Sequence, residues 1–272
     1  MGADFDHMID GLLFGLQNSR PFQVYSQRPW HYAAQKNGKH ATCPTKDFYC
    51  YFLNISNCAP TKPSTMEGQF LTDGYNKQYD IGRWMLEYIA RPQTWLRKAV
   101  YDFVQTRIAI QTPCTVFHVR RADIVLHGNW SRRYRPIEEY VEAAKNYSVS
   151  NKNILLLTDD ANAIDEALAE FPHFNWMYIK RKRHRGAQGG FENQIPSQNP
   201  QQELIILFSI LKLVKQCSAL VHTTGNLAEM IVGEMDSSAT RINLDDLDTE
   251  HELFSANNSF SANLSRPSSF AS

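Results

Sequence analysis

From Cys114 onward, short apolar segments alternate with segments of helical periodicity, and this alternation constrains the fold more than any other feature of the sequence. The apolar segments are rich in aliphatic and β-branched residues and end in polar ones. Strands of this kind, separated by helices, form a parallel sheet that is covered on both faces. The second half of the chain is therefore predicted to be an α/β domain built from βαβ units.

The predicted strands of this half cover residues 115–119, 154–157, 176–179 and 219–222, and its predicted helices cover residues 136–146, 162–170, 204–214 and 227–235. Two further helices are expected upstream, over residues 79–89 and 94–107, with Thr94 as the cap of the second. Changes in composition divide the chain into residues 1–113, residues 114–248 and a Ser- and Asn-rich tail over residues 249–272.

Lys and Arg together number 28, and Asp and Glu together also number 28, so the formal net charge is zero. This balance excludes a globally basic nucleic-acid-binding protein, although local patches of charge remain. No apolar run reaches about 18 residues, so we expect no membrane span in this chain. The first ten residues lack the basic-then-apolar order of a secretory signal.

Five cysteines are too few for a disulfide scaffold, and their spacings match no zinc site. Cys43, Cys50 and Cys58 lie close together, so a bridge within this cluster can form and leave an odd thiol, whereas Cys114 and Cys217 lie in apolar segments. Asn-x-Ser sequons favour a secretory lumen. They occur at Asn54, Asn129, Asn146, Asn257 and Asn263.

Polar clusters follow three of the predicted strands: residues 118–123 (His-Val-Arg-Arg-Ala-Asp), Asp159 with Asp160, and residues 223–226 (Thr-Thr-Gly-Asn). Ligands of open parallel sheets bind at the carboxyl ends of the strands. Adjacent arginines match phosphate oxygens, and the free N–H groups at a helix start attract anions. The three clusters together predict a diphosphate-linked ligand.

Other interpretations of the same residues remain open. The two arginines can pair with aspartates on a solvated rim, and Asp159 and Asp160 can cap the following helix. The basic run over residues 180–185 can steer an anionic donor, contact nucleic acid, or form a solvated loop. Motifs of dehydrogenases, P-loop NTPases, zincins and α/β-hydrolases are absent from the sequence.

The run over residues 118–123 resembles the His-x-Arg-Arg-x-Asp motif of the α1,6-fucosyltransferase family, which includes N-glycan core fucosyltransferases and bacterial chitin-oligosaccharide relatives. Residues 135–140 (Arg-Pro-Ile-Glu-Glu-Tyr) follow in the family's order, and residues 157–160 (Leu-Thr-Asp-Asp) are similar to its second donor motif. The turn at residues 223–226 lies where the family has a Thr- and Ser-containing turn. The resemblance extends over about residues 2–240.

This resemblance implies a GT-B-like architecture of two α/β halves. Residues 1–113 would be the acceptor half, and residues 114–248 the Rossmann-like half that binds the nucleotide sugar. The implied reaction is an inverting, metal-independent transfer of fucose from GDP-fucose to a GlcNAc-containing glycan, α1,6-linked on the N-glycan core. The implied location is the Golgi lumen, and no cofactor is expected.

By position in the motifs, Arg120 and Arg121 would grip the diphosphate, and the other matched residues would line the same site. The expected donor-binding residues are His118, Arg120, Arg121, Asp123, Tyr140, Asp159, Asp160, Thr223, Gly225 and Asn226. The expected catalytic residues are Arg120, Asp123 and His127, the last two as candidates for the base that deprotonates the acceptor hydroxyl.

The sequence departs from the family's pattern after Asp123. Ile124 stands where the family has a lysine, and no acidic residue occurs between Asp123 and Glu138. An alternative hypothesis is therefore a non-catalytic relative that binds a nucleotide sugar or a glycan and has lost the base. A third is an anion- or nucleic-acid-binding module that uses residues 180–185.

Overall fold

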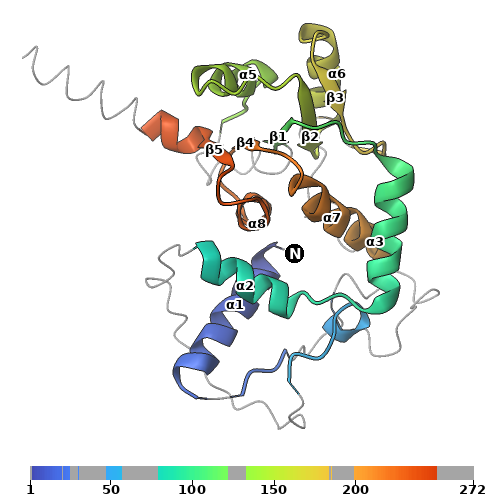
Figure 1. Cartoon of the computed structure of the whole chain (residues 1–272), viewed down its shortest axis with the longest axis vertical. Helices are drawn as coiled ribbons and strands as arrows, with labels where there is room; N and C mark the ends of the chain where they lie inside the picture. The colour runs from blue at the N-terminus through green and yellow to red at the C-terminus, as the bar shows by residue number, and fades with distance from the viewer. Residues whose placement is uncertain are drawn as a thin grey trace, which may run out of the picture.

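The computed structural model describes residues 2–19, 21–24, 30, 47–56, 79–121, 133–183, 185 and 199–249 (Figure 1). Its centre is a parallel sheet of five strands in the order β3-β2-β1-β4-β5. The strands are β1 Cys114–Val119, β2 Asn153–Thr158, β3 Asn175–Met177, β4 Ala219–His222 and β5 Thr240–Asn243. This order, in which the chain winds outward from β1 in both directions, is that of a Rossmann-like sheet.

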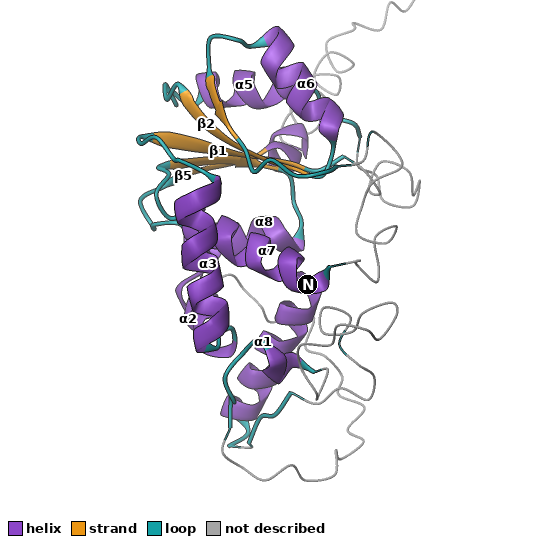
Figure 2. Ribbon diagram, turned by 90° about the vertical axis from the view of Figure 1, so that its right-hand side faces the viewer, coloured by secondary structure: helices purple, strands orange, loops and turns teal. Residues whose placement is uncertain are grey.

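Helices cover both faces of the sheet. The helices α5 Ile137–Asn146 and α6 Ala161–Glu170 lie on one face, and α3 Thr94–Arg107, α7 Pro200–Val214 and α8 Asn226–Glu234 lie on the other (Figure 2). Successive strand residues point to opposite faces, so β1, β2 and β4 each contribute buried residues to two hydrophobic clusters. Val116 and Leu155 belong to the cluster beneath α7 and α8, whereas Phe117 and Leu156 belong to the cluster beneath α5 and α6.

The N-terminal helices pack on the α7 and α8 side. The helices α1 Gly2–Gln17, η1 Phe48–Cys50 and α2 Tyr79–Ile89 share one hydrophobic cluster with that face of the sheet. Phe52 joins the two parts, with its ring 5.7 Å from that of Phe5 and 5.3 Å from that of Phe208. The described residues before Cys114 contain helices and one isolated bridge, so a separate α/β half in residues 1–113 stays a prediction.

Most of the predicted elements are confirmed, with shifts of a few residues at their ends. The first exception is the cap of α3: Gln93, not Thr94, is the cap residue, and its side chain makes no capping hydrogen bond. Strand β3 ends at Met177, two residues before the predicted end. The helix α1 and the edge strand β5 were not predicted. The predicted tail lies outside the described residues from position 250 onward, and residues 244–249 are helical.

A disulfide bond joins Cys114 to Cys217, two cysteines separated by 103 positions. Cys114 begins β1, and Cys217 lies two residues before β4, its neighbour in the sheet, so the sheet brings them together. This pairing was not predicted from the sequence. Cys50 is disulfide-bonded as well. Among the described helices, none combines the length and apolarity needed to cross a membrane.

The Cys114–Cys217 disulfide is expected to contribute about 2–5 kcal/mol to the free energy of unfolding, because it closes a long loop in the unfolded chain. The double variant Cys114→Ala with Cys217→Ala should therefore unfold at a lower urea concentration than the wild type, measured by circular dichroism. Reduction of the wild type should lower the midpoint at least as far, because it also opens the disulfide bond of Cys50. Equal midpoints for the oxidised wild type and the double variant would contradict the expectation.

Candidate functional site

The carboxyl ends of β1 and β4 form the switch point of the sheet, where the winding direction changes and where open parallel sheets bind ligands. His118 of β1 lies beside His222 of β4 in the register of the two strands. Residues 120 and 121 follow β1, and the turn over residues 223–226 follows β4. The structure thus brings two of the predicted polar clusters together, and the third lies next to them at the end of β2.

Arg120 is the first residue after β1 and is half-buried. Its positive charge contributes to the lowered pKa of His118, so the guanidinium lies near the switch point. It is the member of the predicted arginine pair that remains partly open to solvent. An arginine in this place can supply two donors to a phosphate group.

Arg121 is engaged inside the protein, and its side chain is only 1% exposed. The guanidinium lies 2.7 Å from a carboxylate oxygen of Glu166, and its Nε donates to the Arg135 carbonyl at 2.9 Å. It also donates to the Tyr134 hydroxyl at 2.7 Å and lies over the ring of that tyrosine, 4.3 Å from its centre. We therefore assign Arg121 to the internal structure, and its implied role as a diphosphate ligand stays a prediction.

Glu166 on α6 is the partner of Arg121 that the sequence analysis missed. Its other oxygen accepts the main-chain N–H of Ile137, at 2.5 Å, and so caps the start of α5. One carboxylate thus ties α6 both to α5 and to the segment after β1. The sequence held little sign of this, because Glu166 lies 45 positions after Arg121 in a helix with several exposed polar residues.

The two aspartates after β2 also bind within the protein. Asp159 accepts the main-chain N–H of Arg121 at 3.1 Å. Asp160 is fully buried, caps α6 by accepting the N–H of Asn162 at 2.9 Å, and lies 3.8 Å from the Arg121 guanidinium. The capping interpretation that the sequence left open is confirmed for Asp160. The part of either aspartate in donor binding stays a prediction.

Both histidines of the switch point are buried. Burial lowers the pKa of His118 to about 3, with smaller contributions from His222 and from the charge of Arg120. Burial also lowers the pKa of His222, whose Nδ1 lies 3.1 Å from the Thr223 carbonyl. No described residue makes a hydrogen bond to His118 Nδ1. Both imidazoles are neutral at pH 7.

These histidines are expected to make the protein acid-sensitive. An unfolded histidine titrates near pH 6.5, whereas His118 in the folded state stays neutral down to about pH 3. Between these values only the unfolded chain takes up the proton, so the free energy of unfolding falls by up to about 1.4 kcal/mol per pH unit as the pH decreases. Above pH 6.5 this dependence vanishes.

Urea unfolding at pH 7.5 and pH 5.0 measures the effect. His118→Gln should show a smaller loss of stability over this interval than the wild type, because it removes the larger of the two shifts in pKa. Equal losses for the two proteins would show that His118 is not responsible.

The remaining predicted residues near β4 differ in exposure. Tyr140 on α5 is fully buried, packs its ring 5.8 Å from that of Phe117, and has a pKa raised by burial. Thr223 is also buried. Gly225 precedes the first turn of α8, and Asn226, its first residue, is exposed. The start of α8 follows β4, and Arg120 follows β1, the strand that pairs with β4, so both lie at the same edge of the sheet. The first N–H groups of a helix have no partner within that helix.

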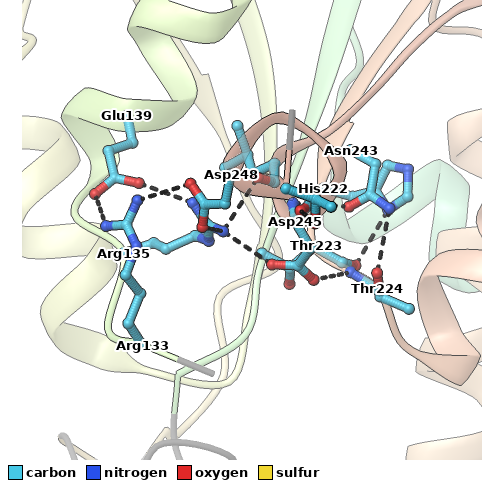
Figure 3. A network of polar contacts seen from close by, with 11 residues as sticks. Arg133, Arg135, Glu139, His222, Thr223, Thr224, Asn243, Asp245 and Asp248 are labelled. Atoms are coloured by element: carbon cyan, nitrogen blue, oxygen red, sulfur yellow. Dashed lines mark hydrogen bonds and ion pairs between the residues drawn. The ribbon is translucent and has the colours of Figure 1, made fainter. Parts of the chain in front are cut away.

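A network of ion pairs connects the segment before α5 to the chain after β5 (Figure 3). Arg135 is 6% exposed and donates to Glu139 at 3.0 Å and to Asp248 at 2.5 Å. Arg133 contacts the same two carboxylates, at 2.5 Å and 3.2 Å. The two arginines and two carboxylates alternate, so each charge lies between charges of opposite sign.

The network reaches the turn before α8 through Asp245. One oxygen of this carboxylate accepts from Arg135 at 2.9 Å, and the other accepts the main-chain N–H of Thr224 at 2.8 Å. Asn243, the last residue of β5, donates to the Thr224 hydroxyl at 3.2 Å. Asp245, Arg135 and Asn243 were not predicted, because no local pattern marks residues that meet only across neighbouring strands.

The basic run binds largely within the protein. Arg181 pairs with Glu203 at 2.9 Å, and Arg185 pairs with Asp165 at 2.5 Å. Arg183 donates to the main-chain carbonyls of residues 158, 179 and 181, and burial lowers its pKa to about 10. Arg181 and Arg183 are therefore engaged by partly buried groups of the protein, whereas the Arg185–Asp165 pair lies on the surface.

Asp123 and His127, the two candidates for the base, lie outside the described residues, and their catalytic role stays a prediction. Among the described residues, no three His, Cys, Asp or Glu side chains gather as a metal site would require. The described part of the site therefore consists of Arg120, the start of α8, and the residues that hold them in place.

The sequence matches no protein-family model. The structure is distantly similar to solved fucosyltransferases. NodZ alpha-1,6-fucosyltransferase soaked with GDP-fucose is 12% identical with a TM-score of 0.38, over 58% of this chain and 47% of that chain. POFUT1 in complex with GDP-fucose is 11% identical with a TM-score of 0.35, over 60% and 49%. NodZ from Bradyrhizobium is 9% identical with a TM-score of 0.35, over 56% and 45%.

The matched part of this chain spans about half the length of each of these fucosyltransferases. The similarity assigns no role to any residue. The chain has an α/β fold with one five-stranded parallel Rossmann-like sheet, distantly similar in structure to GDP-fucose-binding fucosyltransferases.

Proposed function

We propose that this protein is an inverting glycosyltransferase that transfers fucose from GDP-fucose to a GlcNAc-containing glycan without a metal ion. The finer assignment, an α1,6 linkage on the N-glycan core, rests on the motif over residues 118–123. The observation that carries the proposal is that Arg120 and the start of α8 follow two paired strands, β1 and β4, at the switch point of the sheet. A diphosphate is the ligand that suits an arginine fork and free helix N–H groups together.

In the proposed reaction the acceptor hydroxyl attacks the anomeric carbon of fucose while the bond to the β-phosphate of GDP breaks. Negative charge grows on that phosphate in the transition state. Arg120 would stabilise this charge more strongly as it develops, which lowers the barrier. The base that takes the hydroxyl proton would be Asp123 or His127.

We place the protein in the secretory pathway, in the Golgi lumen. The Cys114–Cys217 disulfide and the disulfide-bonded Cys50 support an oxidising compartment, where such bonds persist. The five sequons agree with it. Glycan acceptors and nucleotide sugars would both be partners there.

The purified chain incubated with GDP-fucose and a GlcNAc-terminated glycan tests the proposal. We expect a product heavier by one fucose in the mass spectrum, with release of one GDP per transfer, in the presence of a chelator as well as without it. GDP binding without any product would favour the non-catalytic alternative that has lost the base. The absence of both GDP binding and fucosylated product would contradict the proposal.

A further inference from the structure

The turn before α8 is held by a carboxylate, which is unexpected at a place suited to anions. Asp245 accepts the Thr224 N–H at 2.8 Å, so it occupies one of the donors near the helix start. A lone negative charge here would repel a bound phosphate. A buried arginine behind Asp245 reduces this repulsion.

Arg135 offsets part of the charge of Asp245, although Glu139 and Asp248 share the same guanidinium. Its guanidinium is buried, donates to the other Asp245 oxygen at 2.9 Å, and also donates to the Leu244 carbonyl at 3.1 Å (Figure 3). The carboxylate can thus act as a hydrogen-bond acceptor for the turn while its charge is offset from behind. Such a charge-assisted hydrogen bond is stronger than a neutral one.

We propose that Asp245 is a positioning residue that fixes the turn over residues 223–226, so that the N–H groups at the start of α8 face an anionic ligand. This inference rests on the proposed function in taking that ligand to be the diphosphate of GDP. Asp245 itself does not touch the ligand. Within the described network, it is the only carboxylate that contacts both Arg135 and the turn.

The neighbouring Asp246 offers a matched control. It is exposed, and no described residue forms a hydrogen bond or an ion pair with it. Asp246→Ala therefore removes the same charge from nearly the same place and leaves the turn intact. Any difference between Asp245→Ala and Asp246→Ala therefore reports on the contacts of Asp245 to Thr224 and Arg135 rather than on the loss of a negative charge alone.

Two measurements test the proposal on the full chain. In calorimetric titration with GDP, Asp245→Ala should bind at least tenfold more weakly than the wild type, and Asp246→Ala should stay within about twofold. In hydrogen exchange, the peptide covering residues 219–232 should exchange faster in Asp245→Ala alone, whereas peptides from α6 should not change. Circular dichroism checks that each variant is folded.

Asp245→Asn provides a conservative variant. Its one amide oxygen can serve Thr224 or Arg135 but not both, so both readouts should fall between those of the wild type and the alanine variant. If Asp245→Ala does not fold, Asp245→Asn takes its place in both measurements and tests the positioning role. GDP binding by the folded variants that equals or exceeds that of the wild type would overturn the proposal, because the carboxylate would then only repel the anion.

Failure of the proposed function gives a different pattern. If the wild type does not bind GDP, the nucleotide assignment is wrong, and the exchange experiment still decides the role of Asp245. Faster exchange at the turn in Asp245→Ala, with none in Asp246→Ala, would uphold its positioning role. Unchanged exchange in both would overturn it.

Discussion

Arg121→Met is expected to lower the free energy of unfolding by about 3–5 kcal/mol, the cost of removing one member of a buried ion pair. The variant removes the cation that lies 2.7 Å from the Glu166 carboxylate, 14% exposed, and 3.8 Å from the fully buried Asp160. It also removes the donors to the Arg135 carbonyl and the Tyr134 hydroxyl. Equilibrium unfolding in urea, followed by circular dichroism, measures the loss.

The double variant Arg121→Met with Glu166→Met should recover part of the lost free energy of unfolding, because it removes the Glu166 carboxylate together with the arginine that pairs with it. An exposed pair is the control: Lys98 and Asp102 are 74% and 53% exposed, and Lys98→Met should cost less than about 1 kcal/mol. A folded Arg121→Met of wild-type stability that no longer binds GDP would contradict the structural role and support the implied role as ligand.

In contrast to Arg121→Met, Arg120→Ala is expected to lower the rate of fucose transfer strongly and the stability only slightly. Arg120 is half-buried at the switch point, so its loss should change stability by no more than about 1 kcal/mol. The rate of fucose transfer should fall about 10²-fold or more, by analogy with the loss of one donor to a developing anion. Fluorescence-monitored unfolding and an assay of GDP release report the two quantities on the same preparation.

Arg120→Lys refines this result. Lysine keeps the charge but loses the planar fork, so the variant should recover only part of the rate. Wild-type transfer by Arg120→Ala would remove the observation on which the proposed function rests. Loss of transfer together with unfolding would show that Arg120 belongs to the same internal structure as Arg121.

The βαβ framework was predictable from the sequence because it rests on local patterns. Residues 154–157 are four consecutive aliphatic residues bounded by polar ones, a pattern typical of a strand buried on both faces. The helices α2 and α3 were located by the periodicity of their apolar residues. The edge strand β5 was missed because its one aliphatic residue, Ile242, gives too little alternation to mark it.

The sequence predicted the location of the candidate site but not the roles of its residues. Polar residues that follow parallel strands must gather at one edge of the sheet, so the sequence located the switch point through residues 118–123 and 223–226. It did not separate the two adjacent arginines, because neighbouring residues at a strand end point in different directions. The burial of Arg121 against Glu166, 45 positions away, was beyond any local pattern.

What the sequence determined by itself was the order of strands and helices and the edge at which chemistry can occur, since both follow from hydrophobic period and from the direction of parallel strands. Tertiary structure alone decided which polar residue serves the fold and which remains accessible. Arg121, Asp160 and Arg135 became internal because burial of a charge requires a partner, and each finds its partner on another element. Arg120 is half-buried, and Thr224 and Asn226 are exposed, so this part of the edge is partly open to solvent.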